Sequence, residues 1–465
     1  MNSARTRKRA GFLLRRLGLA AAAVLCLSSF ARPQAAAQES VHWTLADAVG
    51  YSLEHSPDLA VAASRIEETE EARAEVFSNF LPDLSFEGGY TYVDNVPRIS
   101  IDFPVDPPGD LIPPFQINRQ ALIGANDNYK AKLVLNQLLF ASGKVYYAHR
   151  AASSQIDSER ARLEAVRLQV ARAAAEAYNA ALIAQQAVDV QRQSLEAARS
   201  HLAQVQRRHE AGTATRLELL RSEVEVSNRE PRVAEAEKML DLALARLRRA
   251  AGLPEGTPIT LADPIEAAPE EVNEAEALER ALRMRPELAA LGHLQRAAQD
   301  QALAQRGAML PSVLLTGTFG YEKPYFAIDD WERNWTVGVG IRIPLFDGLE
   351  AYHGMKKARA AAATARESAS QAAADIQVEV RSALLELRET TLRIASTRSN
   401  MDRAQDILAI AEESYRAGAS TSLEVIDAQL AATTARLDHL KALYDYRVAR
   451  VRLAAATGDL EAIGR

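Results

Sequence analysis

The strongest constraint in this sequence is that it contains one unit twice. Ser56-Pro57-Asp58-Leu59 returns as Arg285-Pro286-Glu287-Leu288 and Leu81-Pro82 as Leu310-Pro311, both 229 residues later. Leu139-Phe140 returns as Leu345-Phe346 and Ala211-Gly212 as Ala417-Gly418, both 206 residues later. The offset changes once, by 23 residues, in a Pro-rich stretch between Asp94 and Asn128 that is typical of a surface loop. We therefore expect two structural repeats, at residues 38–262 and 263–465, with a Pro- and Glu-rich connector at 253–273.

Each repeat contains a very long stretch that is suited to a helix. Between Phe140 and Gly212, and again between Phe346 and Gly418, lie 71 residues without proline, enough for about 105 Å of helix. Apolar and alanine residues from Leu163 to Val205 recur at a mean spacing of 3.5, the coiled-coil period. Each repeat also contains a helix of roughly 35 residues before its first strand and a returning helix of roughly 40 residues. Laid end to end, these two helices have the same length as the long helix. Each repeat should form two parallel helical columns of equal height.

Four segments alternate apolar and polar residues, the period of a β-strand. They are residues 84–93, 129–140, 313–321 and 335–346. The apolar faces predict a lipid-facing surface formed by Phe86, Tyr90, Tyr92, Leu133, Leu135, Leu315, Phe319, Trp335, Val337, Val339 and Ile341. A half-buried sheet in a soluble domain would show the same alternation, but strands of about ten residues suit a tilted membrane span.

Four strands are too few for a membrane barrel. Bacterial barrels begin at about 8 strands, and an open edge in lipid leaves backbone groups unpaired. A dimer would give about 8 strands and a filled lumen, whereas a trimer gives about 12 and room for water. The expected fold class is mainly α with membrane β-strands: a duplicated helix-strand-strand-helix unit whose three copies complete a 12-stranded barrel above a helical tube about 100 Å long.

Residues 1–37 are typical of a secretory signal peptide. Six basic residues precede an apolar run from Leu17 to Leu27, and Ala35-Ala36-Ala37 offers a cleavage site. Its removal would take seven basic and no acidic residues, moving the formal charge from −6 to −13, which disfavours a nucleic-acid partner. The only cysteine, Cys26, would be lost too, and Leu25 before it does not suit lipid attachment. No later stretch reaches the length of a transmembrane helix, so strands must make any span.

The order, spacing and duplication of these motifs resemble the TolC-type outer-membrane efflux protein family, from about residue 44 to 458. Further matches are Phe80-Leu81-Pro82-Asp83-Leu84 before a strand, Gln137-Leu138-Leu139-Phe140 and Ile343-Pro344-Leu345-Phe346-Asp347-Gly348 at strand ends, and the Ala-Gly turns. The resemblance implies a homotrimeric channel-tunnel of a tripartite efflux or type I secretion system. Such a channel sits in outer-membrane lipid, extends a long helical domain into the periplasm, and is opened by a periplasmic adaptor protein and an inner-membrane transporter.

The same resemblance marks candidate entrance-gate residues. Tyr415, Gly418, Glu424 and Asp427 match the family's tip turn and acidic gate. Glu424 and Asp427 are i, i+3 neighbours, so a trimer would stack two carboxylate rings that attract cations. However, Thr421-x-x-Glu424 is also a capping box, as is Thr215-x-x-Glu218, so capping is an alternative role for both glutamates.

The 206-residue offset places Glu218 opposite Glu424 and Arg221 opposite Asp427. Asp427 has no capping role, and we hypothesise that Arg221 and Asp427 pair between neighbouring coils to hold the entrance shut. Ser420 stands where some family members carry a basic gating residue, so the resemblance does not settle how the closed state is locked.

The turns themselves have two interpretations. Arg208-His209-Glu210-Ala211-Gly212-Thr213 resembles the family's adaptor-docking turn, which makes Gly212, Thr213, Gly418 and Ala419 candidate docking residues. A helix that ends on a left-handed glycine explains Gly212 and Gly418 equally well, and both interpretations can hold together.

No motif predicts an enzyme, a cofactor site or a metal site. The sequence has no glycine-rich phosphate loop and no His-Glu-x-x-His pair, and its eight scattered histidines are expected to be surface polar residues. The alternative function is a periplasmic coiled-coil scaffold or adaptor with a small soluble sheet. An adaptor would need a helical hairpin flanked by lipoyl-like and barrel domains, whereas here strands interrupt the helices twice. The sequence does not distinguish multidrug efflux from protein secretion.

Overall fold

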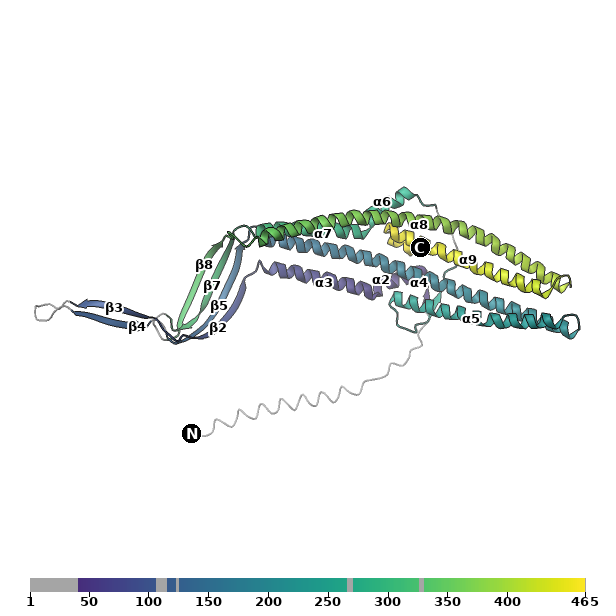
Figure 1. The fold of residues 1–465 in the computed structure, drawn as a ribbon, viewed down its shortest axis with the longest axis horizontal. Helices are drawn as coiled ribbons and strands as arrows, with labels where there is room; N and C mark the ends of the chain where they lie inside the picture. The colour runs from purple at the N-terminus through teal and green to yellow at the C-terminus, as the bar shows by residue number, and fades with distance from the viewer. Residues whose placement is uncertain (1–40, 106–114, 123–124, 266–270, 326–329, 465) are drawn as a thin grey trace, which may run out of the picture.

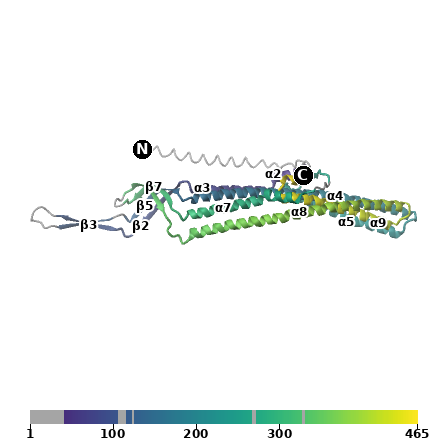
Figure 2. The ribbon, with the colours of Figure 1, turned by 90° about the horizontal axis from the view of Figure 1, so that it is seen from above.

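The protein is long and narrow. The computed structural model describes residues 41–105, 115–122, 125–265, 271–325 and 330–464, so the expected signal peptide lies outside the described residues. A bundle of long helices is followed by a four-stranded sheet and then by a two-stranded hairpin at the far end (Figure 1). Figure 2 shows the same succession from above. The helical turns and the hairpin therefore mark opposite ends of the molecule.

The internal duplication appears as helices of matching length. The two long helices, α4 (Lys144–Glu210) and α8 (Glu350–Arg416), each have 67 residues. The returning helices, α5 (Arg216–Ala251) and α9 (Ser422–Thr457), each have 36. At 1.5 Å per residue α4 and α8 are about 100 Å long, as the proline-free stretches predict.

The helix expected before each first strand is two helices instead of one. Here α2 (Leu45–His55) is followed by α3 (Pro57–Ser78), and α6 (Glu274–Met284) by α7 (Pro286–Gly307). The residues between them, Ser56 and Arg285, have extended backbones with ψ of 128° and 118°. Both precede a proline, which disfavours the helical conformation of the residue before it and itself fits the first position of a helix.

The returning helices end beside these breaks. Gly252 ends α5 in the left-handed conformation with φ of 75°, and a Cβ there would lie 2.6 Å from the His55 carbonyl oxygen. Gly458 ends α9 in the same way, with φ of 75°, and its Cβ would lie 3.2 Å from Met284. Only glycine combines this conformation with so close an approach. In each repeat, the returning helix (α5 or α9) therefore ends where α3 or α7 begins. The two helices form one column beside the long helix.

The main core surrounds the middle of α4. Tyr178 and Ala174 are fully buried there, and the Tyr178 hydroxyl donates to the Trp43 carbonyl at 3.0 Å. Leu247 of α5 and Val451 of α9 join the same cluster, so both repeats contribute to it. A two-stranded parallel sheet of β1 (Val41–Trp43) and β6 (Ile259–Leu261), together with the short helix α10 (Leu460–Ile463), covers this region. The periodicity of the sequence does not predict these three elements.

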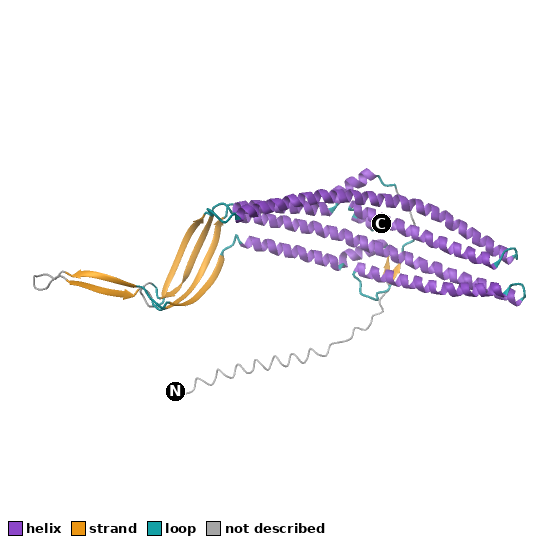
Figure 3. Ribbon diagram, viewed as in Figure 1, coloured by secondary structure: helices purple, strands orange, loops and turns teal. Residues whose placement is uncertain are grey.

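The four-stranded antiparallel sheet has the order β2-β5-β7-β8 (orange in Figure 3). Its strands are β2 (Asp83–Tyr92), β5 (Asp127–Phe140), β7 (Ser312–Lys323) and β8 (Glu332–Arg342). The strands expected at 84–93, 129–140 and 313–321 lie at 83–92, 127–140 and 312–323, and the strand expected at 335–346 lies at 332–342. In register, Phe86 pairs with Leu133, Leu133 with Phe319, and Phe319 with Trp335. One apolar row therefore crosses all four strands.

The Pro-rich stretch expected to be a loop contains a hairpin. Its strands are β3 (Arg98–Val105) and β4 (Phe115–Leu122), with register from Arg98 opposite Leu122 to Val105 opposite Phe115. Proline is excluded from central strands because it lacks an N–H, but a two-stranded ribbon leaves one side of each strand free. Pro104 is accommodated in β3 for this reason.

Candidate functional sites: the helical turns and the exposed sheet

The α4–α5 and α8–α9 turns lie at the end farthest from the sheet (Figure 1). Gly212 and Gly418 are left-handed, with φ of 73° and 77°. The amide of Thr213 donates to the Arg208 carbonyl at 2.8 Å, and the amide of Ala419 donates to the Ser414 carbonyl at 2.8 Å. These bonds satisfy carbonyls at the helix ends, so both glycines end their helices as the left-handed residue that follows the C-cap, Ala211 or Ala417. The docking role of Gly212, Thr213, Gly418 and Ala419 stays a prediction.

Both expected capping boxes are formed. Glu218 Oε2 accepts from the Thr215 amide at 3.1 Å, and the Glu218 amide donates to Thr215 Oγ1 at 3.2 Å. Glu424 and Thr421 make the same two bonds at 3.1 and 3.4 Å. The two glutamates therefore satisfy amides at the starts of α5 and α9. Their gate role stays a prediction.

Asp427 and Arg221 are both exposed, each within two turns of the start of its helix. Within the described part of one protomer, neither side chain forms an ion pair. The structure thus leaves both charges available at the surface, and their pairing between coils is a prediction about assembled copies.

Tyr415 lies inside the bundle and not on the surface. It is 4% exposed and packs with Val205 and Val425. Arg208 Nη1 of α4 donates to the Tyr415 carbonyl at 2.9 Å, and the guanidinium lies 4.7 Å from the centroid of the Tyr415 ring. A hydrogen bond and a cation–π contact therefore join the α8 end to the first coil.

Two histidines correct the expectation of surface positions. His201 of α4 is 5% exposed, its Nε2 lies 2.8 Å from Ser422 Oγ of α9, and its ring centroid lies 5.1 Å from that of Tyr415. His439 of α9 is 8% exposed and contacts Thr397 of α8. Burial lowers the pKa of both imidazoles below the usual value, because removing solvent disfavours the charged form. His201 thus joins the two coils, whereas His439 lies within one.

A third contact between the coils joins Ser194 of α4 to Thr433 of α9 beside Arg229 of α5, and Arg229 is only 2% exposed. Its guanidinium donates to the Ser194 carbonyl at 2.8 Å, to Ser194 Oγ at 2.7 Å, and to Glu225 at 2.7 Å. Thr433 Oγ1 of α9 lies 3.1 Å from Ser194 Oγ. We call the contacts centred on Arg208, His201 and Arg229 the coil junction. The sequence signal for the coil junction is weak, because it consists only of polar residues at positions where the helical period expects apolar ones.

The apolar face of the four-stranded sheet is open to its surroundings. Phe86 is 70% exposed, Trp335 66%, Val337 66% and Ile341 70%. Among the described residues, no large apolar side chain of β2, β5, β7 or β8 belongs to the buried core. Water-exposed apolar surface on this scale marks a contact with lipid or protein. In the part of the chain that the structure describes, no helix is both long and apolar enough to cross a membrane.

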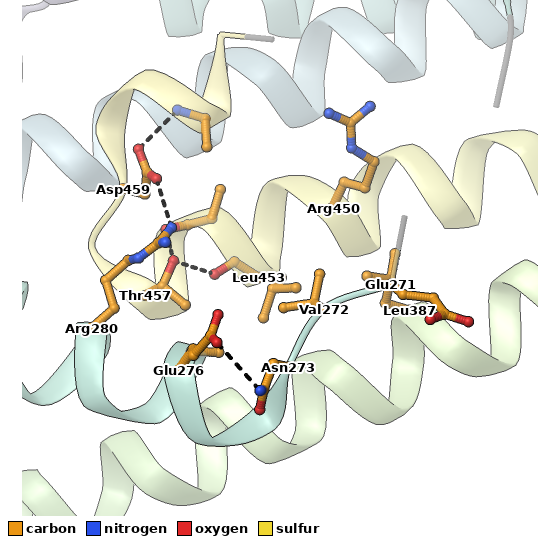
Figure 4. A pocket seen from close by; sticks show the side chains of 13 residues that line it. Glu271, Val272, Asn273, Glu276, Arg280, Leu387, Arg450, Leu453, Thr457 and Asp459 are labelled. Atoms are coloured by element: carbon orange, nitrogen blue, oxygen red, sulfur yellow. Dashed lines mark hydrogen bonds and ion pairs between the residues drawn. The ribbon is translucent and has the colours of Figure 1, made fainter. Parts of the chain in front are cut away.

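A pocket of about 240 Å³ lies between α6, α8, α9 and α10 (Figure 4). Arg280 pairs with Asp459 across it at 3.3 Å, and Asp459 also caps α10 by accepting from the Ala462 amide at 3.0 Å. Thr457 donates to a carbonyl of its own helix. The polar groups of this pocket join the ends of neighbouring helices, and we assign the pocket no binding role. The described residues contain no cluster of three or more potential metal ligands.

Long duplicated helices, an exposed four-stranded sheet and hairpin turns at the opposite end define a class of outer-membrane channel protomers. The chain belongs to the outer membrane efflux protein family, whose sequence profile matches residues 49–253 and 277–459. It is therefore an outer-membrane protein with a long periplasmic helical domain.

Individual relatives agree with this assignment. The alkaline protease secretion protein AprF of Pseudomonas aeruginosa is 27% identical over 276 residues, which cover 55% of this chain and 54% of AprF. The outer membrane efflux protein BepC of Brucella suis is 25% identical over 40% of this chain and 41% of BepC. The chain thus aligns with about half the length of these relatives or less. The CmeC outer membrane channel of Campylobacter jejuni shares the fold, with a TM-score of 0.72 and 18% identity over 89% of this chain and 85% of CmeC.

Proposed function

We propose that three copies of this chain form a passive exit duct through the outer membrane, and that the chain is not an enzyme. The exposed apolar row of the sheet carries this proposal. In one protomer β2 and β8 are edge strands, so backbone groups along both edges lack partners within the sheet. Lipid cannot satisfy these groups, but β8 of one copy can pair with β2 of the next. Three copies give about 12 strands and a water-filled lumen.

The helices extend this lumen into the periplasm. About 100 Å of α4 and α8 would carry the duct toward the inner membrane. We propose that a periplasmic adaptor and an inner-membrane transporter engage the turns at Gly212, Thr213, Gly418 and Ala419. AprF is named for alkaline protease secretion and BepC for efflux, so the cargo proposed for this duct is a secreted protein or an efflux substrate.

The turns would form the entrance gate. Three copies would present Asp427 and Glu424 as two carboxylate rings that favour cations. The exposed Arg221 of the first coil can pair with Asp427 of the second and hold the ring closed. Tyr415 would act from within the bundle, because its contacts fix the end of α8.

Purified protein in planar lipid bilayers tests this function. We expect a cation-preferring channel, and Asp427→Asn should weaken the cation preference and enlarge the conductance. Arg221→Gln should enlarge the conductance while preserving the cation preference. Asp375→Asn, at an exposed carboxylate near the middle of α8, serves as a charge-matched control. An Asp427→Asn channel with unchanged conductance and selectivity would remove this residue from the gate, and a protein without conductance would refute the duct.

A further inference from the structure

We propose that His201 is a proton-sensitive link between the two coils, so that acidification of the periplasm loosens the coil junction. The proposal rests on the proposed function, because the junction lies directly behind the entrance turns. It assigns a regulatory role to a residue outside the predicted gate.

The position of His201 is unusual for a titratable group. It lies in the long helix of the first repeat, while its hydrogen-bond partner Ser422 is the first residue of α9 in the second repeat. Its ring also contacts Tyr415, the penultimate residue of α8. One imidazole thus contacts both helices of the second coil at their turn. A charge placed on this ring acts on the contact between the coils and not within either coil.

Charged side chains of both signs surround the ring. Arg208 lies on α4 itself, and α5 contributes the buried Arg229, paired with Glu225, as well as Glu218, which is held in its capping box. A pocket of about 90 Å³ beside the ring is lined by Glu412, Tyr415 and Arg416 of α8. The lining residues from α9, Val425 and Gln429, are uncharged, and Glu424 at the start of that helix is engaged in its cap. Protonated His201 would therefore be a buried cation that Arg229 opposes and that Glu218 favours, with loss of solvent as the larger effect.

The closed junction is already incompletely satisfied. Arg229 Nη2 and Gln429 Oε1 are buried atoms without a hydrogen-bond partner, and Gln429 is only 3% exposed. Such groups regain hydrogen bonds with water when a contact opens. These new hydrogen bonds lower the free energy needed to open the junction. One additional buried charge on His201 is therefore large enough to shift the equilibrium between the closed and open junction.

The direction of the pH effect follows from linkage. Burial, with Arg229 adding to it, lowers the pKa of His201 when the junction is closed, whereas an opened, solvated imidazole would regain its ordinary pKa near ~6.5. The open form then binds the proton more tightly than the closed form. The closed junction has its full stability above the pKa of the open form and loses stability as pH falls below it.

Single-channel recording tests this switch with three proteins. Between about pH 7.5 and about pH 5.5, we expect a several-fold gain in mean current for the wild type. His201→Gln keeps a hydrogen-bonding group near Ser422 but cannot be charged, and its current should not respond to pH. His439→Gln removes the other buried histidine, which lies within one coil, and should respond like the wild type. An acid response that survives in His201→Gln, or is absent from the wild type, overturns the proposal.

Cysteine cross-linking gives a second readout that does not require conductance. Beyond Cys26 the chain has no cysteine, so introduced pairs are unambiguous. Gln193 and Arg436, which are hydrogen-bonded at 3.2 Å between α4 and α9, report the junction, and Arg192 and Glu237, paired at 2.6 Å between α4 and α5, report one coil. Because thiol reactivity changes with pH in the same way for both pairs, this dependence drops out when the junction yield is divided by the yield within the coil. This ratio should fall several-fold at acidic pH in the wild type and stay constant in His201→Gln.

The two proposals fail in different ways. A protein that never conducts refutes the duct, while the cross-linking ratio still reports the junction. A protein that conducts without any response to pH refutes the switch alone. A constant cross-linking ratio in the wild type would also overturn the switch.

Discussion

Arg208 and Tyr415 join the two repeats at their turns: the guanidinium donates to the Tyr415 carbonyl at 2.9 Å and lies 4.7 Å from the centroid of its ring. Tyr415 is the penultimate residue of α8, where carbonyls lack partners in their own helix. The Tyr415 carbonyl accepts from the Gly418 amide at 3.1 Å, and Arg208 of the other repeat supplies a second donor. The end of the second coil is thus held by the first coil.

Replacing Arg208 with alanine should loosen this end of the bundle. The hydrogen bond and the cation–π contact together contribute about 2 kcal/mol. We expect faster hydrogen exchange at the end of α8 and a larger channel conductance. Arg207→Ala removes an exposed neighbour that makes no such contact and should leave both measurements unchanged. Equal effects of the two substitutions would show that general charge, and not the Tyr415 contact, controls the turn.

The capping boxes can be tested separately from the gate. Thr421→Ala removes the side chain that accepts from the Glu424 amide and should cost about 1 kcal/mol in local helix stability. Hydrogen exchange should accelerate over the first turn of α9, and Thr215→Ala should do the same in α5. Cation selectivity should persist, because the Asp427 carboxylate remains in place. If the substitution abolished selectivity but left exchange rates unaltered, capping would not be the role of this motif.

Gly252 and Gly256 provide a matched pair for backbone geometry. Both have positive φ, 75° and 88°, but only at Gly252 would a Cβ collide with another segment, 2.6 Å from the His55 carbonyl oxygen. Alanine at Gly256 should cost about 1–2 kcal/mol. Alanine at Gly252 should cost about 3 kcal/mol or more, because the α2–α3 break must also shift. Thermal unfolding of the two variants checks this, and equal shifts would mean that the contact with His55 is unimportant.

The two faces of β8 should respond oppositely to charge. Val337 is 66% exposed on the apolar face, and its neighbour Thr336 lies on the polar face. In lipid, Val337→Arg should destabilise each strand by about 2–4 kcal/mol and reduce outer-membrane trimers. Thr336→Arg should assemble normally and alter only conductance. Trimer yield on unheated gels measures both, and equal tolerance of the two arginines would argue against lipid on the Val337 side.

The regular parts of the fold were predictable because they depend on local periodicity. Alternation located β2, β5, β7 and β8, and the absence of proline predicted the lengths of α4 and α8. The breaks at Ser56 and Arg285 were missed although proline follows each of them. The hairpin from Arg98 to Leu122 is not predictable from the pattern, because a Pro-rich stretch is typical of a loop.

The coil junction was not predictable from periodicity. His201 and Ser422 are 221 residues apart, and only the packing of α4 against α9 brings them together. Sequence offsets identified equivalent positions such as Arg221 and Asp427, but they do not show which equivalent positions touch. Capping was easier to predict, since Thr215 and Glu218 are three residues apart and their bonds are local.

The proposed duct depends on identical copies completing the exposed sheet in the outer membrane. Native mass spectrometry of the full-length protein, extracted from outer-membrane fractions in mild detergent, measures this directly. We predict a complex of three chains that retains bound lipid and dissociates on heating. A lipid-free single chain recovered from the periplasmic fraction would contradict the account.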